Sequence, residues 1–126
     1  NKHIRSMSIH KILLAEDEPI IAWDMTRVLE SLSCQVLQVN HAHSILPACA
    51  DFLPDFAILN FHYSKHLDSF SIARQLRIHY SVKTLFVTGA RAKDIFRSKD
   101  FYAGHDVLFK PYSRRQLRST LTKFLP

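Results

Sequence analysis

Residues 56–60, FAILN, form an apolar run that stops abruptly at the amide side chain of Asn60. Four other short apolar runs occur along the chain: KILLA (11–15), QVLQV (35–39), TLFVT (84–88) and DVLFK (106–110). Short runs of Leu, β-branched and aromatic residues are typical of strands that are buried on both faces. The sequence therefore predicts five strands at these positions.

The segments between these runs have the spacing of amphipathic helices. Apolar residues three and four positions apart predict helices over 19–32, 45–52, 70–80 and 117–125, and a short helix around 95–96. Pro19 suits the first turn of its helix, and Pro54 ends the second helix. Because parallel strands need crossover connections, this alternation predicts a doubly wound α/β fold with helices on both faces of the sheet.

Length and composition favour one domain. The chain has 126 residues, of which 47% are apolar, enough to build a single core. We expect one domain over 7–126, with Met7 as the native start and 1–6 as a cloning remnant or a disordered tail. Two cysteines without a pairing framework, no signal-peptide pattern and no long apolar run predict a cytoplasmic protein that does not enter the membrane.

The net charge of +6 is unevenly distributed. Residues 1–90 contain eight basic and eight acidic residues, whereas residues 91–126 contain nine basic and three acidic residues. The basic end of the chain is either a solvated surface or a docking surface for an acidic protein or a nucleic acid. Composition alone leaves both interpretations open.

Polar side chains stand where the predicted strands end. The first strand is followed by the carboxylates of Glu16, Asp17 and Glu18, and the third, fourth and fifth strands end at Asn60, Thr88 and Lys110. In doubly wound sheets, ligands bind at the carboxyl ends of the strands. Grouped carboxylates suit Mg²⁺, and an ammonium with a hydroxyl suits a phosphoryl group.

Four motifs in order resemble the receiver domain of two-component response regulators: AEDEP (15–19), Asn60, TGA (88–90) and FKPYS (109–113). The resemblance covers about residues 10–125. It implies a flavodoxin-like, three-layer fold with five helices and the strand order 2-1-3-4-5. It also implies that Glu16, Asp17 and the main-chain carbonyl of His62 bind the metal.

On the same resemblance, Thr88 and Lys110 sense the phosphoryl group, and Asn60 occupies the position of the phosphoacceptor aspartate. An amide is a far poorer nucleophile than a carboxylate, so we expect no phosphorylation at Asn60. Loss of one anionic ligand predicts weak or absent Mg²⁺ binding. The loop HYSKHLDS lacks the family's usual Pro and Gly, and Val107 stands where the family often has an aromatic switch residue.

Three functions remain open at this stage. The favoured one is a degenerate, non-enzymatic receiver that binds a protein partner independently of phosphorylation. The partner is a histidine kinase, a phosphotransfer protein or an effector domain, and a homodimer is a further option. The contact would use the fourth and fifth helices, with their basic residues Arg91, Lys93, Arg97, Lys99, Arg114, Arg115 and Arg118. The alternatives are an ordinary receiver whose acceptor Asp was replaced by Asn, and a basic nucleic-acid-binding module.

Overall fold

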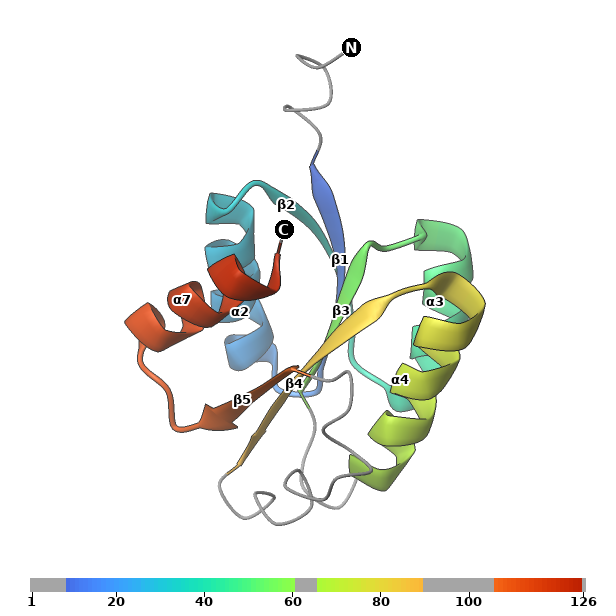
Figure 1. The fold of residues 1–126 in the computed structure, drawn as a ribbon. Coiled ribbons are helices and arrows are strands. Elements are labelled where there is room, and N and C mark those ends of the chain that lie inside the picture. Colours follow the sequence, from blue (N-terminus) through green and yellow to red (C-terminus); the bar gives the residue numbers. More distant parts are fainter. Residues whose placement is uncertain (1–8, 61–65, 90–105, 126) are drawn as a thin grey trace.

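The structure is a computed structural model that describes residues 9–60, 66–89 and 106–125, with no description of the side chains at 66–68 (Figure 1). Five strands form one parallel sheet in the order β2-β1-β3-β4-β5. They are β1 (His10–Glu16), β2 (Cys34–Val39), β3 (Phe56–Asn60), β4 (Lys83–Gly89) and β5 (Asp106–Lys110). The predicted strands and their flavodoxin-like order are confirmed.

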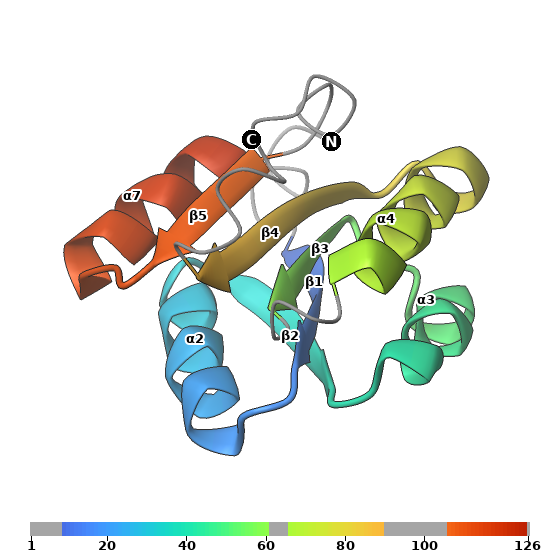
Figure 2. The same cartoon turned by 90° about the horizontal axis from the view of Figure 1, so that it is seen from below.

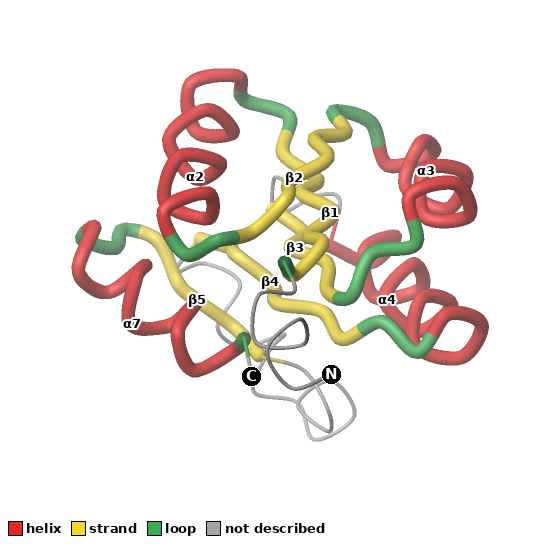
Figure 3. The backbone as a smooth tube through the Cα atoms, turned by 90° about the horizontal axis from the view of Figure 1, so that it is seen from above, coloured by secondary structure: helices red, strands yellow, loops and turns green. Residues whose placement is uncertain are grey.

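Helices cover both faces of this sheet (Figures 2 and 3). The described α-helices are α2 (Pro19–Ser31), α3 (Ile45–Phe52), α4 (His66–Tyr80) and α7 (Arg114–Phe124), and a short 3₁₀ turn, η1 (Ala42–Ser44), precedes α3. Helices α2 and α7 lie on one face, and α3 and α4 lie on the other. The helix predicted around residues 95–96 lies outside the described residues. None of the described helices has the length and apolar character needed to span a membrane.

Local sequence explains where several helices begin and end. Pro19 occupies the first turn of α2, where its missing N–H costs nothing. Helix α3 ends at Phe52. The N–H of its C-cap residue Leu53 still donates to the carbonyl of Cys49, and the positive φ of Leu53, 52°, turns the chain out of the helix. Ser113 and Gln116 form a reciprocal capping box at the start of α7.

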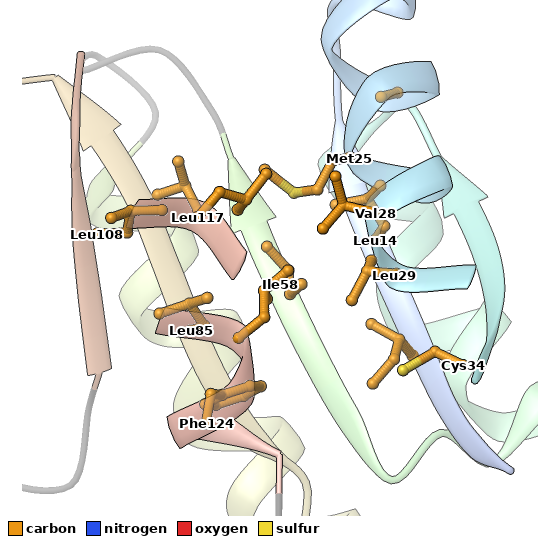
Figure 4. Close-up of a cluster of buried hydrophobic side chains, with 14 residues drawn as sticks. Leu14, Met25, Val28, Leu29, Cys34, Ile58, Leu85, Leu108, Leu117 and Phe124 are labelled. Atoms are coloured by element: carbon orange, nitrogen blue, oxygen red, sulfur yellow. The ribbon is translucent and has the colours of Figure 1, made fainter. Parts of the chain in front are cut away.

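Strand alternation divides the core into two layers. Ile12, Leu14 and Ile58 pack toward α2 and α7, whereas Leu13, Ala57 and Leu59 pack toward α3 and α4. Figure 4 shows the first layer, in which Met25 and Val28 of α2 lie on the same face of the sheet as Leu117 of α7. Each fully buried aliphatic side chain contributes about 1.5–3 kcal/mol of transfer free energy, so both layers hold the sheet rigid.

Candidate functional site

Parallel register brings the predicted site residues to one edge of the sheet. Glu16 is the register partner of Asn60, and Asn60 is the partner of Val87. On the next strand pair, Gly89 is the partner of Lys110. The carboxyl ends of β1, β3, β4 and β5 therefore meet, and the site is built on strands that the two core layers fix in place.

Asn60 is a fully buried amide at the end of the central strand β3, with a relative exposure of 0%. Neither its Nδ2 nor its Oδ1 has a hydrogen-bond partner in the described part of the chain. A buried polar group without a partner costs about 1–3 kcal/mol. The core therefore gains nothing from the amide of Asn60, whose burial lowers stability in the described structure.

Glu16 lies beside Asn60 and is also buried, with an exposure of 3%. Its Oε1 accepts a hydrogen bond of 3.0 Å from the backbone N–H of Glu18, whereas its Oε2 has no partner among the described residues. Burial raises the pKa of Glu16 to about 7, although the Glu18 hydrogen bond and the charge of Lys110 act to lower it. The carboxylates of Asp17 and Glu18 act in the same direction as burial. Desolvation therefore dominates at this carboxyl group.

The three acidic residues after β1 form one cluster. Glu16, Asp17 and Glu18 each have a carboxylate oxygen, and these oxygens lie within 4.8 Å of one another. Carboxylate oxygens at this spacing can share a hard cation. At position 60, where the resemblance places an aspartate, Asn60 has a neutral oxygen. A site made of Glu16, Asp17 and Asn60 therefore has one negative charge fewer than a site with an aspartate at position 60.

Thr88 and Lys110 end β4 and β5 at the same edge. Thr88 is fully buried and Lys110 is half-buried, and the charge of Lys110 acts on Glu16. Alternation along β4 puts Thr88 on the same side as Phe86, whereas Asn60 shares the side of Ile58. The phosphate-sensing roles of Thr88 and Lys110 remain predictions.

Tyr112 is a residue of this region that the sequence analysis missed. It is half-buried and packs against the core layer under α2 and α7. Burial raises the pKa of its phenol, and the charges of Glu16 and Asp24 raise it further. Its place in the sequence, just after Lys110 and Pro111, was the available signal.

The basic residues predicted to contact a partner divide into two groups on α7. Arg114 forms an ion pair with Asp24 of α2, and Arg118 donates a hydrogen bond of 3.2 Å to the hydroxyl of Ser31. Arg115 is exposed, and so is Lys123, which was not among the predicted residues. Arg114 and Arg118 thus help to hold α7 against α2, which the sequence did not reveal. The other predicted residues, His62, Arg91, Lys93, Arg97 and Lys99, lie outside the described residues.

Solved structures of other proteins resemble this chain, although its sequence matches no known family. No family model matches the sequence, and no curated protein matches it either. A response regulator from Thermotoga maritima is similar over 94% of this chain and 98% of its own, with 15% identity and a TM-score of 0.77. The PhyR receiver (REC) domain from Erythrobacter litoralis is similar over 95% of this chain and 92% of its own, with 17% identity and a TM-score of 0.79.

A third similar structure is SdrG from Sphingomonas melonis Fr1, with 27% identity and a TM-score of 0.70. The similarity covers 94% of this chain and 98% of SdrG. All three structures match nearly end to end, and two of them are described as a response regulator or its receiver domain. The chain therefore has the fold of the receiver domain of response regulators.

Proposed function

We propose that the chain is a receiver-like signalling domain of a two-component or phosphorelay system that acts without being phosphorylated. The observation that carries this proposal is the buried, neutral amide of Asn60 beside Glu16, at the edge where the resemblance places the phosphoacceptor. The domain would be a non-enzymatic binding module. Its two free, buried cysteines suit the reducing conditions of the cytoplasm.

The chemistry at Asn60 argues against phosphoryl transfer. In an ordinary receiver, a carboxylate oxygen attacks phosphorus to form an aspartyl phosphate, while a metal ion and a lysine balance the charge. An amide oxygen carries no full negative charge, and its O-phosphorylated form would not persist. Thr88 and Lys110 would then have no phosphoryl group to sense.

Mg²⁺ binding should be weak or absent for the same reason. Glu16 and Asp17 are the described side chains that would hold the ion, and Asn60 supplies only a neutral oxygen. Mg²⁺ demands near-ideal octahedral geometry and gives up its water reluctantly. Loss of one carboxylate therefore removes part of the charge that offsets this dehydration.

The partner is proposed to be an acidic protein surface that docks on α7 and on the segment before β5. It would belong to a histidine kinase, a phosphotransfer protein or an effector domain, and a second copy of the chain is the alternative. On α7, the exposed Arg115 and Lys123 could contact it, together with Arg114 and Arg118, which are also exposed but bond to α2. Basic residues at a rim of this kind mainly steer association and set its salt dependence.

The proposal is tested by phosphorylation of the isolated chain. Incubation with acetyl phosphate and Mg²⁺ should leave the intact mass unchanged, and beryllium fluoride with Mg²⁺ should leave the backbone amide shifts of Glu16 and Asn60 unchanged. Buffer without Mg²⁺ is the control. A phosphoryl adduct at residue 60, or a saturable response to beryllium fluoride, would contradict the proposal.

A second candidate is an ordinary receiver whose acceptor Asp was replaced by Asn. The retained set of Glu16, Asp17, Thr88 and Lys110 at one sheet edge favours it. The substitution Asn60→Asp separates the two candidates. Mg²⁺-dependent phosphorylation of this variant would indicate a competent site that is only blocked at residue 60. Continued failure would indicate that the surrounding loops no longer support the chemistry.

A further inference from the structure

Strand β2 forms one edge of the sheet. It stands at the end of the strand order, and among the described strands it pairs with β1 alone (Figure 3). In a strand that pairs on one side, every second residue directs its N–H and C=O away from the partner strand. The outer side of β2 therefore offers a row of backbone donors and acceptors.

The sequence of β2 lacks the features that usually block such an edge. The segment CQVLQV contains no Pro, no Gly and no charged residue. Natural edge strands are commonly protected by charged side chains, by Pro or by bulges. Strand β5, at the opposite edge, contains Asp106 and Lys110, and Asp106 pairs with Lys83 of β4 at 3.3 Å. Of the two edges, β2 is therefore the one open to a further strand.

The side chains of β2 also suit strand pairing. Gln35 and Gln38 are exposed, and Val36 and Leu37 in the middle of the strand are only partly buried. Short segments that combine high β-propensity, no charge and no Pro are the ones that pair most readily between chains. An added strand would cover more of Val36 and Leu37 and would satisfy the outward backbone groups.

The charges around β2 favour a second copy of this chain as the added strand's source. Each copy carries a net charge of +6, so two copies repel one another across a cationic surface. Residues 31–50 contain no Lys, Arg, Asp or Glu, and the exposed acids Glu30 and Asp51 border this stretch. Helices α2 and α3, which flank β2, contain one Lys or Arg between them, Arg27, and it stacks on Trp23. Two copies can therefore meet here without placing cations against each other.

We propose that β2 pairs with β2 of a second copy, antiparallel about a two-fold axis, and joins the two five-stranded sheets into one. An axis perpendicular to the sheet keeps α2 on the same face in both copies, and either Val36 or Leu37 then lies opposite its own counterpart. The outer edges of the joined sheet are the two copies of β5, whose charges oppose further addition, so the assembly closes at two copies. Neither Asn60 nor α7 takes part in this contact, which is independent of the proposed function.

The pairing is tested first on the unchanged chain. A contact along one short strand is small, so we expect a weak dimer that forms as the protein concentration approaches the millimolar range. Sedimentation velocity measures the mass, and amide hydrogen exchange locates the contact. Outward amides of β2 should exchange more slowly at high than at low protein concentration, whereas the amides of β5 should not change. A monomer at every concentration, larger assemblies, or protection that avoids β2 would overturn the pairing.

Charged variants of the two exposed glutamines test the same contact by repulsion. With either Val36 or Leu37 on the axis, the two copies of Gln35 or of Gln38 become diagonal neighbours. The double variant Gln35→Lys with Gln38→Lys should therefore raise the dissociation constant of the dimer about tenfold or more, because like charges across paired strands repel. The double variant Gln35→Glu with Gln38→Glu should do the same. Far-UV circular dichroism checks that both variants stay folded.

A mixture of the two double variants supplies the decisive result. Opposite charges would then face each other, so the Lys and Glu variants should form a mixed dimer at least as readily as the unchanged chain dimerises. Ser71→Lys with Ser119→Lys is the matched control, since it adds the same charge at exposed positions on α4 and α7. This control should dimerise like the unchanged chain. Failure of the mixture to pair, or an equal loss of dimer in the control, would overturn the proposed edge contact.

Discussion

At the scale of single residues, Glu16 and Asn60 are both buried polar side chains on neighbouring strands of a rigid sheet. Each leaves at least one polar atom without a partner in the described part of the molecule. Such atoms lower stability unless a bound group satisfies them. Glu16 and Asn60 therefore form a polar site inside the fold and lower the free energy of unfolding.

The raised pKa of Glu16 predicts a pH dependence of stability. Its pKa rises from 4.5 to about 7 because burial disfavours the charged form. The folded state thus binds the proton more tightly than the unfolded state. This contribution is fully present below about pH 4.5 and is lost as the pH rises through about 7, amounting to at most about 3 kcal/mol.

Glu16→Gln isolates this contribution, since Gln keeps the shape and cannot ionise. We expect the free energy of unfolding of the variant, relative to the unchanged chain, to increase between about pH 5 and about pH 8. Urea unfolding at both pH values measures the difference, with Glu30→Gln as the exposed control. A gap between Glu16→Gln and the unchanged chain that stays constant with pH would show that Glu16 does not titrate in this range.

At the scale of elements, some features of helix α7 follow from its local sequence, and others depend on its contacts with α2. Leu117, Leu121 and Phe124 are buried at helical spacing, so the amphipathic pattern predicted this helix correctly. The capping box at its start is likewise a local feature. The role of Arg114, which pairs with Asp24 ninety positions earlier, depends on the docking of α7 beside α2.

The cap of α7 gives a prediction at this scale. The hydroxyl of Ser113 accepts a hydrogen bond of 3.0 Å from the N–H of Gln116. Ser113→Ala removes this bond and should lower the free energy of unfolding by about 1 kcal/mol. Denaturant unfolding measures the loss. The matched control is Ser119→Ala on the exposed side of the same helix, where Ala has the higher helix propensity and stability should rise slightly or stay unchanged. Equal effects of the two substitutions would mean that the cap contributes nothing.

At the scale of the whole molecule, the sheet lies between two core layers, and the same strands contribute side chains to both layers. Central strand β3 supplies Ile58 to the layer under α2 and α7, and Leu59 to the layer under α3 and α4. Damage to one layer should therefore destabilise both. Trp23, the single tryptophan, is exposed on α2, whose buried side chains belong to the layer that does not contain Leu59, so its fluorescence follows the unfolding of that helix.

Leu59→Ala tests this coupling. The substitution should lower the free energy of unfolding by about 2–5 kcal/mol, because Leu59 is 1% exposed and its loss leaves a cavity. Trp23 fluorescence and far-UV circular dichroism should follow the same transition. Ile78→Ala is the control, since Ile78 is 64% exposed and its loss should change stability by less than about 0.5 kcal/mol. Separate transitions by the two probes would mean that the layers unfold independently.

The amino-acid sequence determined most of this molecule's fold. Apolar runs predicted all five strands to within a residue at each end, because buried parallel strands need apolar side chains on both faces. Helix α4 begins at His66, earlier than the predicted 70, since its first turn has too few apolar residues to show helical periodicity. Strand-end motifs likewise identified Glu16, Asn60, Thr88 and Lys110 as site candidates.

Tertiary structure alone decided which of these groups are neighbours and what environment they share. The register of β1 with β3 places Glu16 against Asn60, and the two core layers bury both, which raises the pKa of Glu16. A cleft lined by Asp17 and Gln38 and the pairing of Arg114 with Asp24 join residues that are far apart in the chain. Local patterns report which face of an element is apolar, whereas burial, register and contacts between elements depend on how all of them pack together.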